Sequence, residues 1–360
     1  MADPRVEAYA RLLVEYSLDV QPRMQVLVAT TPLARPLYEA CVRAIARRGA
    51  FAIPRITWGG SVLMEKTWLA AAPEELLGEL APVDRHLGEN VDAAIVIEAP
   101  ENTRADSDLT SERLAKGQAA IRPLLDRVTA HSFPWVLCQY PTPALAQDAG
   151  MSAAAFEDVL YDACLIDWAA EGERMRRLAG RLQQARELRI VGPGTDLTLA
   201  LEGRGVRASE GRFNMPDGEV FFPPHEESAD GEVHFSEFPA VFEGRELSGI
   251  RLRFRDGAVV DASAGSGEEF LHEVLDRDAG ARRLGEVGIG CNPGITRYMR
   301  NTLFDEKMDG TVHLALGQSY TDLGGLNEST IHWDLVKDLR HGGRLELDGK
   351  VVQQDGAWLS

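Results

Sequence analysis

Cysteine is scarce in this sequence. Only four of its 360 residues are cysteines (Cys41, Cys138, Cys164 and Cys291), and no two of them form a CxxC pair. Zinc sites made of cysteine clusters and disulfide frameworks both need closely spaced or numerous cysteines. The scarcity therefore argues against both kinds of site and predicts buried, reduced thiols, which fit a cytoplasmic protein.

Long apolar runs are missing as well. The residues after Met1, ADPRVEAY, contain neither the basic nor the apolar region of a secretory signal. The longest apolar runs, such as Ala93–Ile97, are far too short to span a bilayer. We therefore expect no membrane partner and a location in the cytoplasm.

Positive charge is the third deficit. Lysine and arginine number 38 against 56 aspartates and glutamates, which gives a formal net charge of −18 at pH 7. Nucleic-acid binding needs a basic patch that releases counterions from phosphates, so a nucleic-acid partner is not expected. Part of the acidic excess has another explanation, because a site for divalent cations carries uncompensated carboxylates until the metal binds.

The first half of the chain alternates between strand-like and helical patterns. Helical spacing of apolar residues covers Leu33–Arg48 and Thr110–Val128. Short apolar runs typical of strands lie at Met24–Thr30, Phe51–Thr57, Val91–Glu98 and Pro134–Tyr140. This alternation predicts an α/β domain with a mostly parallel sheet covered by helices on both faces. No GxGxxG motif follows the first strand, so a dinucleotide-binding site is not indicated.

The pattern changes after a long helical stretch, Ser152–Leu188. We place the domain boundary near Gly180–Val191, with an N-terminal α/β domain over residues 1–185 and a β-rich α+β metal-binding domain over residues 186–360. Alternating segments separated by glycine-containing turns predict antiparallel sheet in the second domain. These segments are Asp196–Leu201, Gly231–Phe235, Ile250–Phe254 and Ala258–Val260. One predicted helix, Glu268–Ala281, follows them.

Two of the eight histidines stand in apolar, strand-like contexts. His313 lies in TVHLALGQSY, and His332 lies in STIHWDLV, two residues before Asp334. On a strand, residues two apart point to the same face, so His332 and Asp334 could bind one ion. An HxD pair alone is weak support, and both histidines could instead be core imidazoles that bond to backbone carbonyls.

Three glutamates lie in surroundings that do not favour a free charge. Glu219 follows a turn in FNMPDGEVFFPP, Glu286 lies among glycines in LGEVGIGCNPGI, and Glu306 lies in NTLFDEKMDG. A carboxylate in an apolar context is costly unless it is paired or bound to metal. With Asp334, these glutamates bring four negative charges, which two divalent cations would cancel. Imidazole and carboxylate ligands together suit zinc, manganese or cobalt better than calcium or copper.

Each of these glutamates also has a plainer interpretation. Glu219 could be a solvated turn residue, Glu286 a cap after the preceding helix, and Glu306 a surface charge. The charged loop HEESADGEVH and the turn before it hold residues that we expect to face solvent: Asp217, His225, Glu226 and His234.

Four segments of the second half, in this order, resemble the thermophilic-type metalloaminopeptidases, the family of aminopeptidase T and aminopeptidase S. They are NMPDGEVF, LGEVGIGCNPGI, NTLFDEK…VHLALGQSY and IHWDLV. The first half agrees with the family only in its α/β character and length. The resemblance implies a two-metal centre bridged by Glu286, and the ligands that it implies are Glu219, Glu286, His313, His332 and Asp334. It also matches Tyr320 and Glu306 to a tyrosine and an acidic residue at the family's metal centre.

The function that this resemblance implies is a metal-dependent aminopeptidase, which releases N-terminal amino acids from short peptides through a two-metal-activated water. Glu286 or Glu306 would shuttle the proton to the leaving amine, and Tyr320 would donate to the oxyanion or bind one ion. The expected cofactors are two divalent ions per chain, zinc, cobalt or manganese, in a homodimer. The segments after Glu306 and Tyr320 differ in length from those of the family, so the preferred N-terminal residue stays open.

Two other functions remain open at this point. A mononuclear non-heme iron ring-cleaving dioxygenase of the same fold needs two histidines and one carboxylate with open positions. His332 and Asp334 would serve it, but a glutamate stands at position 286, where its second histidine is expected. The other alternative is a metal-stabilised binding protein without turnover.

Overall fold

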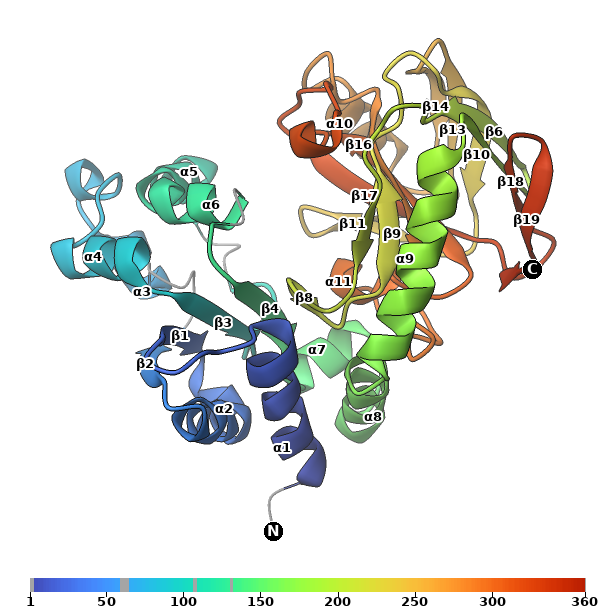
Figure 1. The fold of residues 1–360 in the computed structure, drawn as a ribbon. Helices are drawn as coiled ribbons and strands as arrows, with labels where there is room; N and C mark the ends of the chain where they lie inside the picture. Colours follow the sequence, from blue (N-terminus) through green and yellow to red (C-terminus); the bar gives the residue numbers. More distant parts are fainter. Residues whose placement is uncertain (1–2, 59–64, 106–108, 130–131, 360) are drawn as a thin grey trace. The chain divides into compact units, whose positions relative to one another are not determined.

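A computed structural model of the chain describes residues 3–58, 65–105, 109–129 and 132–359 (Figure 1). The chain forms two compact units. The first unit comprises residues 1–165 and 211–216, and the second comprises residues 166–210 and 217–360. The chain therefore passes between the units after residues 165, 210 and 216, whereas the domain boundary near residue 185 stays a prediction.

A five-stranded parallel sheet forms the centre of the first unit. Its strands lie in the order β2-β1-β3-β4-β8, and every neighbouring pair is parallel. They are β1 (Gln25–Thr30), β2 (Phe51–Ile56), β3 (Ala93–Glu98), β4 (Trp135–Gln139) and β8 (Asn214–Met215). The inner strands β1 and β3 are buried along most of their length, as expected for strands with helices on both sides. The predicted α/β fold with a mostly parallel sheet is confirmed.

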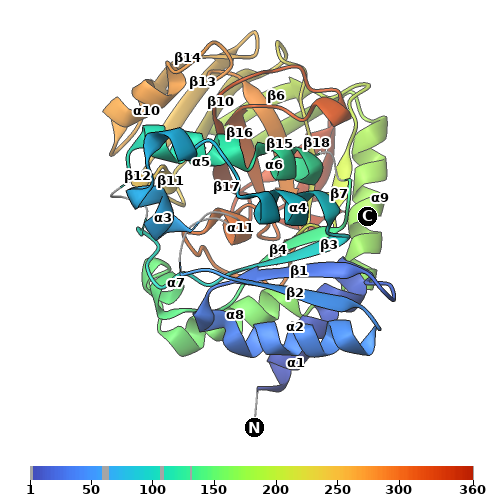
Figure 2. The same cartoon turned by 90° about the vertical axis from the view of Figure 1, so that its left-hand side faces the viewer.

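Helices lie on both faces of this sheet (Figure 2). On one face are α1, α2 and α8; on the other are α4 and α6, whose Leu87 and Leu124 pack against the cluster that contains Leu27 of β1. The helices are α1 (Pro4–Arg11), α2 (Arg35–Arg47), α3 (Lys66–Ala71), α4 (Pro82–Asn90), α5 (Ser111–Ala120), α6 (Arg122–Thr129), α7 (Pro143–Asp148) and α8 (Ala153–Cys164). The helix predicted over residues 110–128 is thus divided between α5 and α6.

The long helical stretch predicted for residues 152–188 is interrupted. α8 ends at Cys164, and α9 (Trp168–Gln184), which belongs to the second unit, begins after Asp167. The Asp167 carboxylate accepts hydrogen bonds from the backbone N–H groups of Ala169 and Ala170, which have no partner within the new helix. The last part of the predicted stretch is strand β5 (Glu187–Gly192).

Two large antiparallel sheets and one hairpin form most of the second unit. The eight-stranded sheet has the order β14-β13-β10-β6-β5-β18-β19-β20. Its other strands are β6 (Thr195–Ala200), β10 (Asp230–Phe235), β13 (Ile250–Arg255), β14 (Ala258–Ser263), β18 (Arg344–Leu347), β19 (Lys350–Gln354) and β20 (Ala357–Trp358). The hairpin pairs β11 (Ala240–Phe242) with β12 (Arg245–Leu247). These strands confirm the predicted β-rich character of this half.

The second antiparallel sheet has five strands in the order β17-β16-β15-β9-β7. They are β7 (Arg207–Ser209), β9 (Glu219–Phe222), β15 (Leu284–Gly290), β16 (Thr311–Gly317) and β17 (His332–Asp338). Strand β17 packs against β10, and its fully buried Trp333 stacks on Phe242 of the hairpin, with ring centroids 5.0 Å apart. Because side chains alternate along a strand, His332 and Asp334 point to the face opposite Trp333.

Two short helices complete the second unit, α10 (Glu268–Leu275) and α11 (Thr302–Asp305). α10 ends earlier than the predicted Ala281, because the carboxylate of Asp278 accepts hydrogen bonds from the N–H groups of Gly280 and Ala281. Such local bonds compete with those of a helix and turn the chain. In the described parts of both units, no helix combines the length and apolar character needed to cross a membrane.

Candidate metal centre

Four neighbouring strands bring the predicted ligands to one face of the five-stranded sheet. Cross-strand partners share a face, and so do residues two apart on one strand. Glu286 pairs with Ala315, which in turn pairs with Asp334, and Glu219 pairs with Gly290 on the strand that carries Glu286. This register gathers the predicted ligands Glu219, Glu286, His313, His332 and Asp334.

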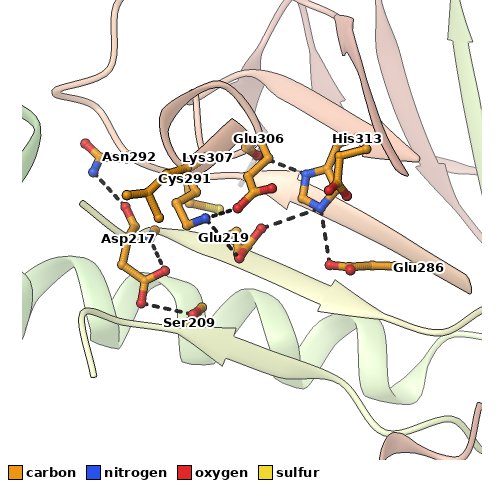
Figure 3. A network of polar contacts seen from close by, with 12 residues as sticks. Ser209, Asp217, Glu219, Glu286, Cys291, Asn292, Glu306, Lys307 and His313 are labelled. Carbon is orange, nitrogen blue, oxygen red and sulfur yellow. Dashed lines mark hydrogen bonds and ion pairs between the residues drawn. The ribbon is translucent and has the colours of Figure 1, made fainter. Parts of the chain in front are cut away.

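These side chains form two groups of potential ligands that share Glu286. One group is Glu219, Glu286 and His313, the other is Glu286, His332 and Asp334, and the ligand atoms of each group lie within 4.8 Å of one another. His313 Nε2 lies 3.2 Å from Glu286 Oε1 and 3.5 Å from Glu219 Oε2 (Figure 3). His332 Nε2 lies 3.2 Å from Glu286 Oε2 and 3.6 Å from Asp334 Oδ1. Glu286 therefore turns one oxygen toward His313 of the first group and the other toward His332 of the second.

Both imidazoles are anchored through the nitrogen that faces away from the carboxylates. His313 Nδ1 lies 2.9 Å from the carbonyl oxygen of Glu306, and His332 Nδ1 lies 2.9 Å from that of Gln318. A carbonyl oxygen only accepts hydrogen bonds, so each Nδ1 carries the hydrogen and donates it. The nitrogen left to lose its proton and bind a metal is Nε2, which points into the cluster.

A glycine makes room for one of these rings. Gly288 of β15 is the cross-strand partner of His313. A Cβ atom at Gly288 would overlap the His313 imidazole. Gly288 thus leaves the space that the ring occupies over the neighbouring strand, a requirement that the sequence alone did not indicate.

The acidic ligands respond differently to burial. Burial raises the pKa of Glu219 to about 8, against the attraction of a nearby lysine. Burial likewise raises the pKa of Asp334 to about 6, although the charge of His332 opposes it. Burial acts in the same direction at Glu286, but hydrogen bonds from the two histidines outweigh it and hold the pKa of that carboxyl well below its usual range. Glu286 is therefore ionised at neutral pH.

The histidines hold protons in the metal-free chain. Burial disfavours their charged forms, but the Glu286 hydrogen bond and the surrounding carboxylates raise the pKa of both His313 and His332 to about 10. At pH 7 each ring therefore donates from Nε2 toward the cluster. A metal ion has to displace these protons, because imidazole binds metal in its neutral form.

One oxygen of Glu219 has no hydrogen-bond donor. The residue is 6% exposed, and its Oε2 is fully buried without a hydrogen-bond partner. A buried carboxylate oxygen in this state is costly unless a cation or donor satisfies it. This oxygen, two inward-facing imidazole nitrogens and two further carboxylates make a donor set that fits a first-row divalent metal.

Glu306 and Tyr320 lie beside the two groups rather than in them. The Glu306 carboxylate pairs with Lys307, and its own backbone carbonyl orients His313. The Tyr320 ring meets the His332 ring edge-on, with centroids 5.9 Å apart. Burial raises the pKa of Tyr320 well above its usual range, and the carboxylates of the cluster add to this. The hydroxyl therefore stays protonated.

Lys307 is the residue of this cluster that the sequence analysis missed. Its side chain is 0% exposed, forms an ion pair with Glu306, and has its Nζ 3.6 Å from Glu219 Oε1 (Figure 3). The only available cue was its place directly after Glu306 in DEK, which did not separate it from a surface lysine.

Two acidic residues expected to face solvent do not. Asp217 is fully buried, and its Oδ2 accepts a 2.9 Å hydrogen bond from Ser209 Oγ. Glu226 is half-buried and pairs with Arg204 at 2.6 Å. Polar neighbours in the sequence suggested an exposed position for both residues, but their partners come from other segments of the chain.

The histidines of the charged loop lie outside both ligand groups. The prediction that they face solvent is wrong in detail, since His225 and His234 are each half-buried. The Nε2 of His225 lies 2.8 Å from the carbonyl oxygen of Glu202, and the backbone of His234 pairs within the eight-stranded sheet.

A pocket opens beside Asp334. Most of its walls are apolar or aromatic, and Tyr298 and Phe238 stack there with ring centroids 4.8 Å apart. Its lining includes Phe235, Phe238, Val241, Tyr298, Asn301, Asp305, Asp334 and Leu335. Of the five predicted ligands, Asp334 is the one that lines this pocket.

The sequence is similar to known metalloproteases over nearly its whole length. The profile of the family described as thermophilic metalloprotease (M29) matches residues 2–358. Aminopeptidase 2 of Geobacillus stearothermophilus is 30% identical over 414 residues, which cover 99% of this chain and 98% of that protein. Aminopeptidase T of Thermus aquaticus is 28% identical, with 97% of each chain covered.

Two solved structures share the fold. Wild-type AmpT from Thermus thermophilus has a TM-score of 0.81 at 27% identity, covering 99% of both chains. A 2,5-dihydroxypyridine dioxygenase from Pseudomonas putida KT2440 has a TM-score of 0.61 at 16% identity, covering 99% of this chain and 97% of that one. At 16% identity the second likeness concerns the fold alone.

Proposed function

Because the chain belongs to the thermophilic metalloprotease family (M29) and is a metalloaminopeptidase, we propose that two divalent cations joined by Glu286 form its catalytic centre. One ion would bind to Glu219, Glu286 and His313, and the other to Glu286, His332 and Asp334. Zinc, cobalt and manganese suit this mixture of imidazole and carboxylate ligands.

The observation that carries this proposal is the position of Glu286 between the histidines. Its Oε1 and Oε2 lie 3.2 Å from His313 and His332, one oxygen for each ring. A mononuclear iron site needs only two histidines and one carboxylate. The cluster holds three carboxylates, Glu219, Glu286 and Asp334, which is two more than that requirement, so the dioxygenase alternative is not favoured.

The residues around the ligands have separate tasks in peptide hydrolysis. When bound, the ions supply an activated water and polarise the scissile carbonyl. Tyr320 keeps its hydroxyl proton and donates it as a hydrogen bond to the oxyanion. Glu306, whose side chain is 15% exposed, would carry the proton to the leaving amine.

The substrates in this proposal are short peptides with a free N-terminus. The pocket beside Asp334 takes the first side chain, and its stacked aromatic wall suits apolar residues. The acidic ligands attract the free α-amino group, which makes the enzyme an exopeptidase. A cytoplasmic homodimer completes the proposal and follows from the family resemblance.

The test combines metal analysis with peptidase rates for wild type and Glu286→Gln. Wild type should hold two ions per chain and cleave aminoacyl amides. Glutamine keeps the shape of the bridge but removes its charge, so occupancy of both positions should fall and activity should drop about 100-fold or more. The matched control is Glu232→Gln, an exposed position on β10 of the same unit, which should retain both properties.

The proposal fails on either of two results. One ion per wild-type chain, with dioxygen consumed on a dihydroxylated ring and no amide cleavage, would support the iron alternative. Full metal content and full activity in Glu286→Gln would show that Glu286 does not bridge two ions.

A further inference from the structure

Lys307 places a permanent positive charge inside the proposed metal centre (Figure 3). Its Nζ pairs with Glu306 Oε1 and lies 3.6 Å from Glu219 Oε1. The carboxylates of Glu219 and Glu306 thus face the ammonium within the cluster. A buried ammonium is stable when carboxylates pair with it in this way, so the lysine brings its charge into the cluster.

The surroundings leave this lysine no alternative position. Its side chain is 0% exposed, so it has no route to solvent. Its backbone carbonyl accepts hydrogen bonds from the N–H groups of Cys291 at 3.1 Å and Asn292 at 2.8 Å. Asn292 Nδ2 in turn donates to the carbonyl oxygen of Asp217 at 2.7 Å. The segment after β15 thus fixes the lysine next to β9.

The charge acts on one half of the cluster. Glu219 turns Oε1 toward Lys307 and leaves Oε2, without a donor, toward His313. The ion pairs of Asp334 involve His332, with no lysine or arginine among the described residues.

We infer that Lys307 makes the two metal positions unequal, so that the ion at Glu219, Glu286 and His313 binds after, and more weakly than, the ion at Glu286, His332 and Asp334. This inference rests on the proposed two-metal function. A fixed cation repels a dication nearby, and it takes up part of the charge that Glu219 would offer as a ligand. The number of uncompensated ligand charges sets the affinity of a site for a hard cation.

Unequal positions have a functional result. At low free metal the enzyme would carry one ion, and it would gain the second only as the metal concentration rises. Peptidase activity would then follow the occupancy of the weaker position. The lysine would act as a positioning residue for Glu219, and its charge would set the metal concentration at which peptidase activity appears.

The test is a calorimetric titration of metal-stripped protein with Co²⁺, with bound metal counted after dialysis. Wild type should bind two ions in separate steps. Lys307→Met removes the charge at similar length, and the second step should tighten about tenfold or more while the first changes little. Lys307→Arg keeps the charge and should preserve two unequal steps.

A variant that leaves the lysine in place gives the opposite sign. Glu306→Gln removes the other strong partner of Lys307, so its full charge falls on Glu219 and the second step should weaken. Circular dichroism verifies the fold of each variant, and a second step that Glu306→Gln leaves unchanged or tightens would overturn the inference even if Lys307→Met does not fold.

The results separate the role of Lys307 from the proposed two-metal function. Equal steps in wild type, or a second step that Lys307→Met leaves unchanged or weaker, would overturn the role of the lysine alone. Uptake of fewer than two ions by wild type would instead overturn the two-metal function on which the inference rests.

Discussion

At the scale of single residues, His332 and Asp334 offer the most direct test of the ligand set. Both lie on β17, with side chains on one face and His332 Nε2 3.6 Å from Asp334 Oδ1. Replacing either with alanine removes a ligand of the same ion, so metal content should fall and peptidase activity should drop about 100-fold or more. Near wild-type activity with full metal content in either variant would show that this group is not the site.

The bystander histidines provide the controls for that experiment. His225 and His234 belong to neither ligand group, although both are half-buried. Alanine at either position should leave the number of bound ions unchanged, as measured by elemental analysis of the dialysed protein. Loss of one ion in either variant would move the metal site toward their loop.

At the scale of elements, the contact between β15 and β16 fixes the position of His313. A side chain at Gly288 would occupy the space of the imidazole, so Gly288→Ala should displace the ring and release the ion bound by Glu219, Glu286 and His313. Gly180→Ala is the matched control. That glycine lies in α9, a Cβ atom there would meet no neighbour within 4 Å, and alanine should stabilise the helix by about 0.5–1 kcal/mol. Metal counts and thermal melting of both variants check the prediction, which a Gly288→Ala variant with both ions would contradict.

The elements themselves were largely predictable, because local patterns determine them. Strands such as β1 and β3 carry continuous apolar runs, and the HxD pair of β17 already specifies one face. The register that aligns β9, β15, β16 and β17 joins segments far apart in the sequence, and no local pattern contains it. The resemblance to a family supplied the ligands as a set, whereas the pairing of atoms within the set came from the structure.

The errors have the same origin. Asp217 and Lys307 look like surface charges in their local sequence, but both are fully buried, and their partners Ser209 and Glu219 lie on strands β7 and β9. The break between α8 and α9 was visible in principle, since Asp167 is a good helix cap, but the surrounding helical pattern concealed it.

At the scale of the whole molecule, the cluster couples metal binding, pH and stability. The pKa values of His313 and His332 rise from about 6.5 to about 10 on folding without metal, and that of Glu219 rises from about 4.5 to about 8. Each group therefore favours the folded state at low pH, and this contribution is lost as pH rises through its folded pKa. Between pH 7 and pH 10 the metal-free protein should become progressively less stable, because its folded state holds protons that the unfolded chain has released.

Metal should reverse that trend. The ions replace the ligand protons, and at a hundredfold excess over the dissociation constant a bound ion adds about 2.7 kcal/mol to the free energy of unfolding. Thermal melting of stripped and metal-loaded protein across this pH range checks the prediction. A stripped protein that gains stability toward pH 10 would contradict the assigned proton positions.

The ligands Glu219, Glu286, His313, His332 and Asp334 come from strands of a hydrogen-bonded ladder and not from the segments that connect them. A ladder keeps its spacing when a connection is lengthened, shortened or exchanged. The exposed residues of the segment between Tyr320 and His332 and of the β11–β12 hairpin can therefore vary without shifting the ligands. This separation makes the protein a favourable starting point for directed evolution. Libraries confined to these connections could yield variants with new peptide preferences, while the metal ligands stay in place.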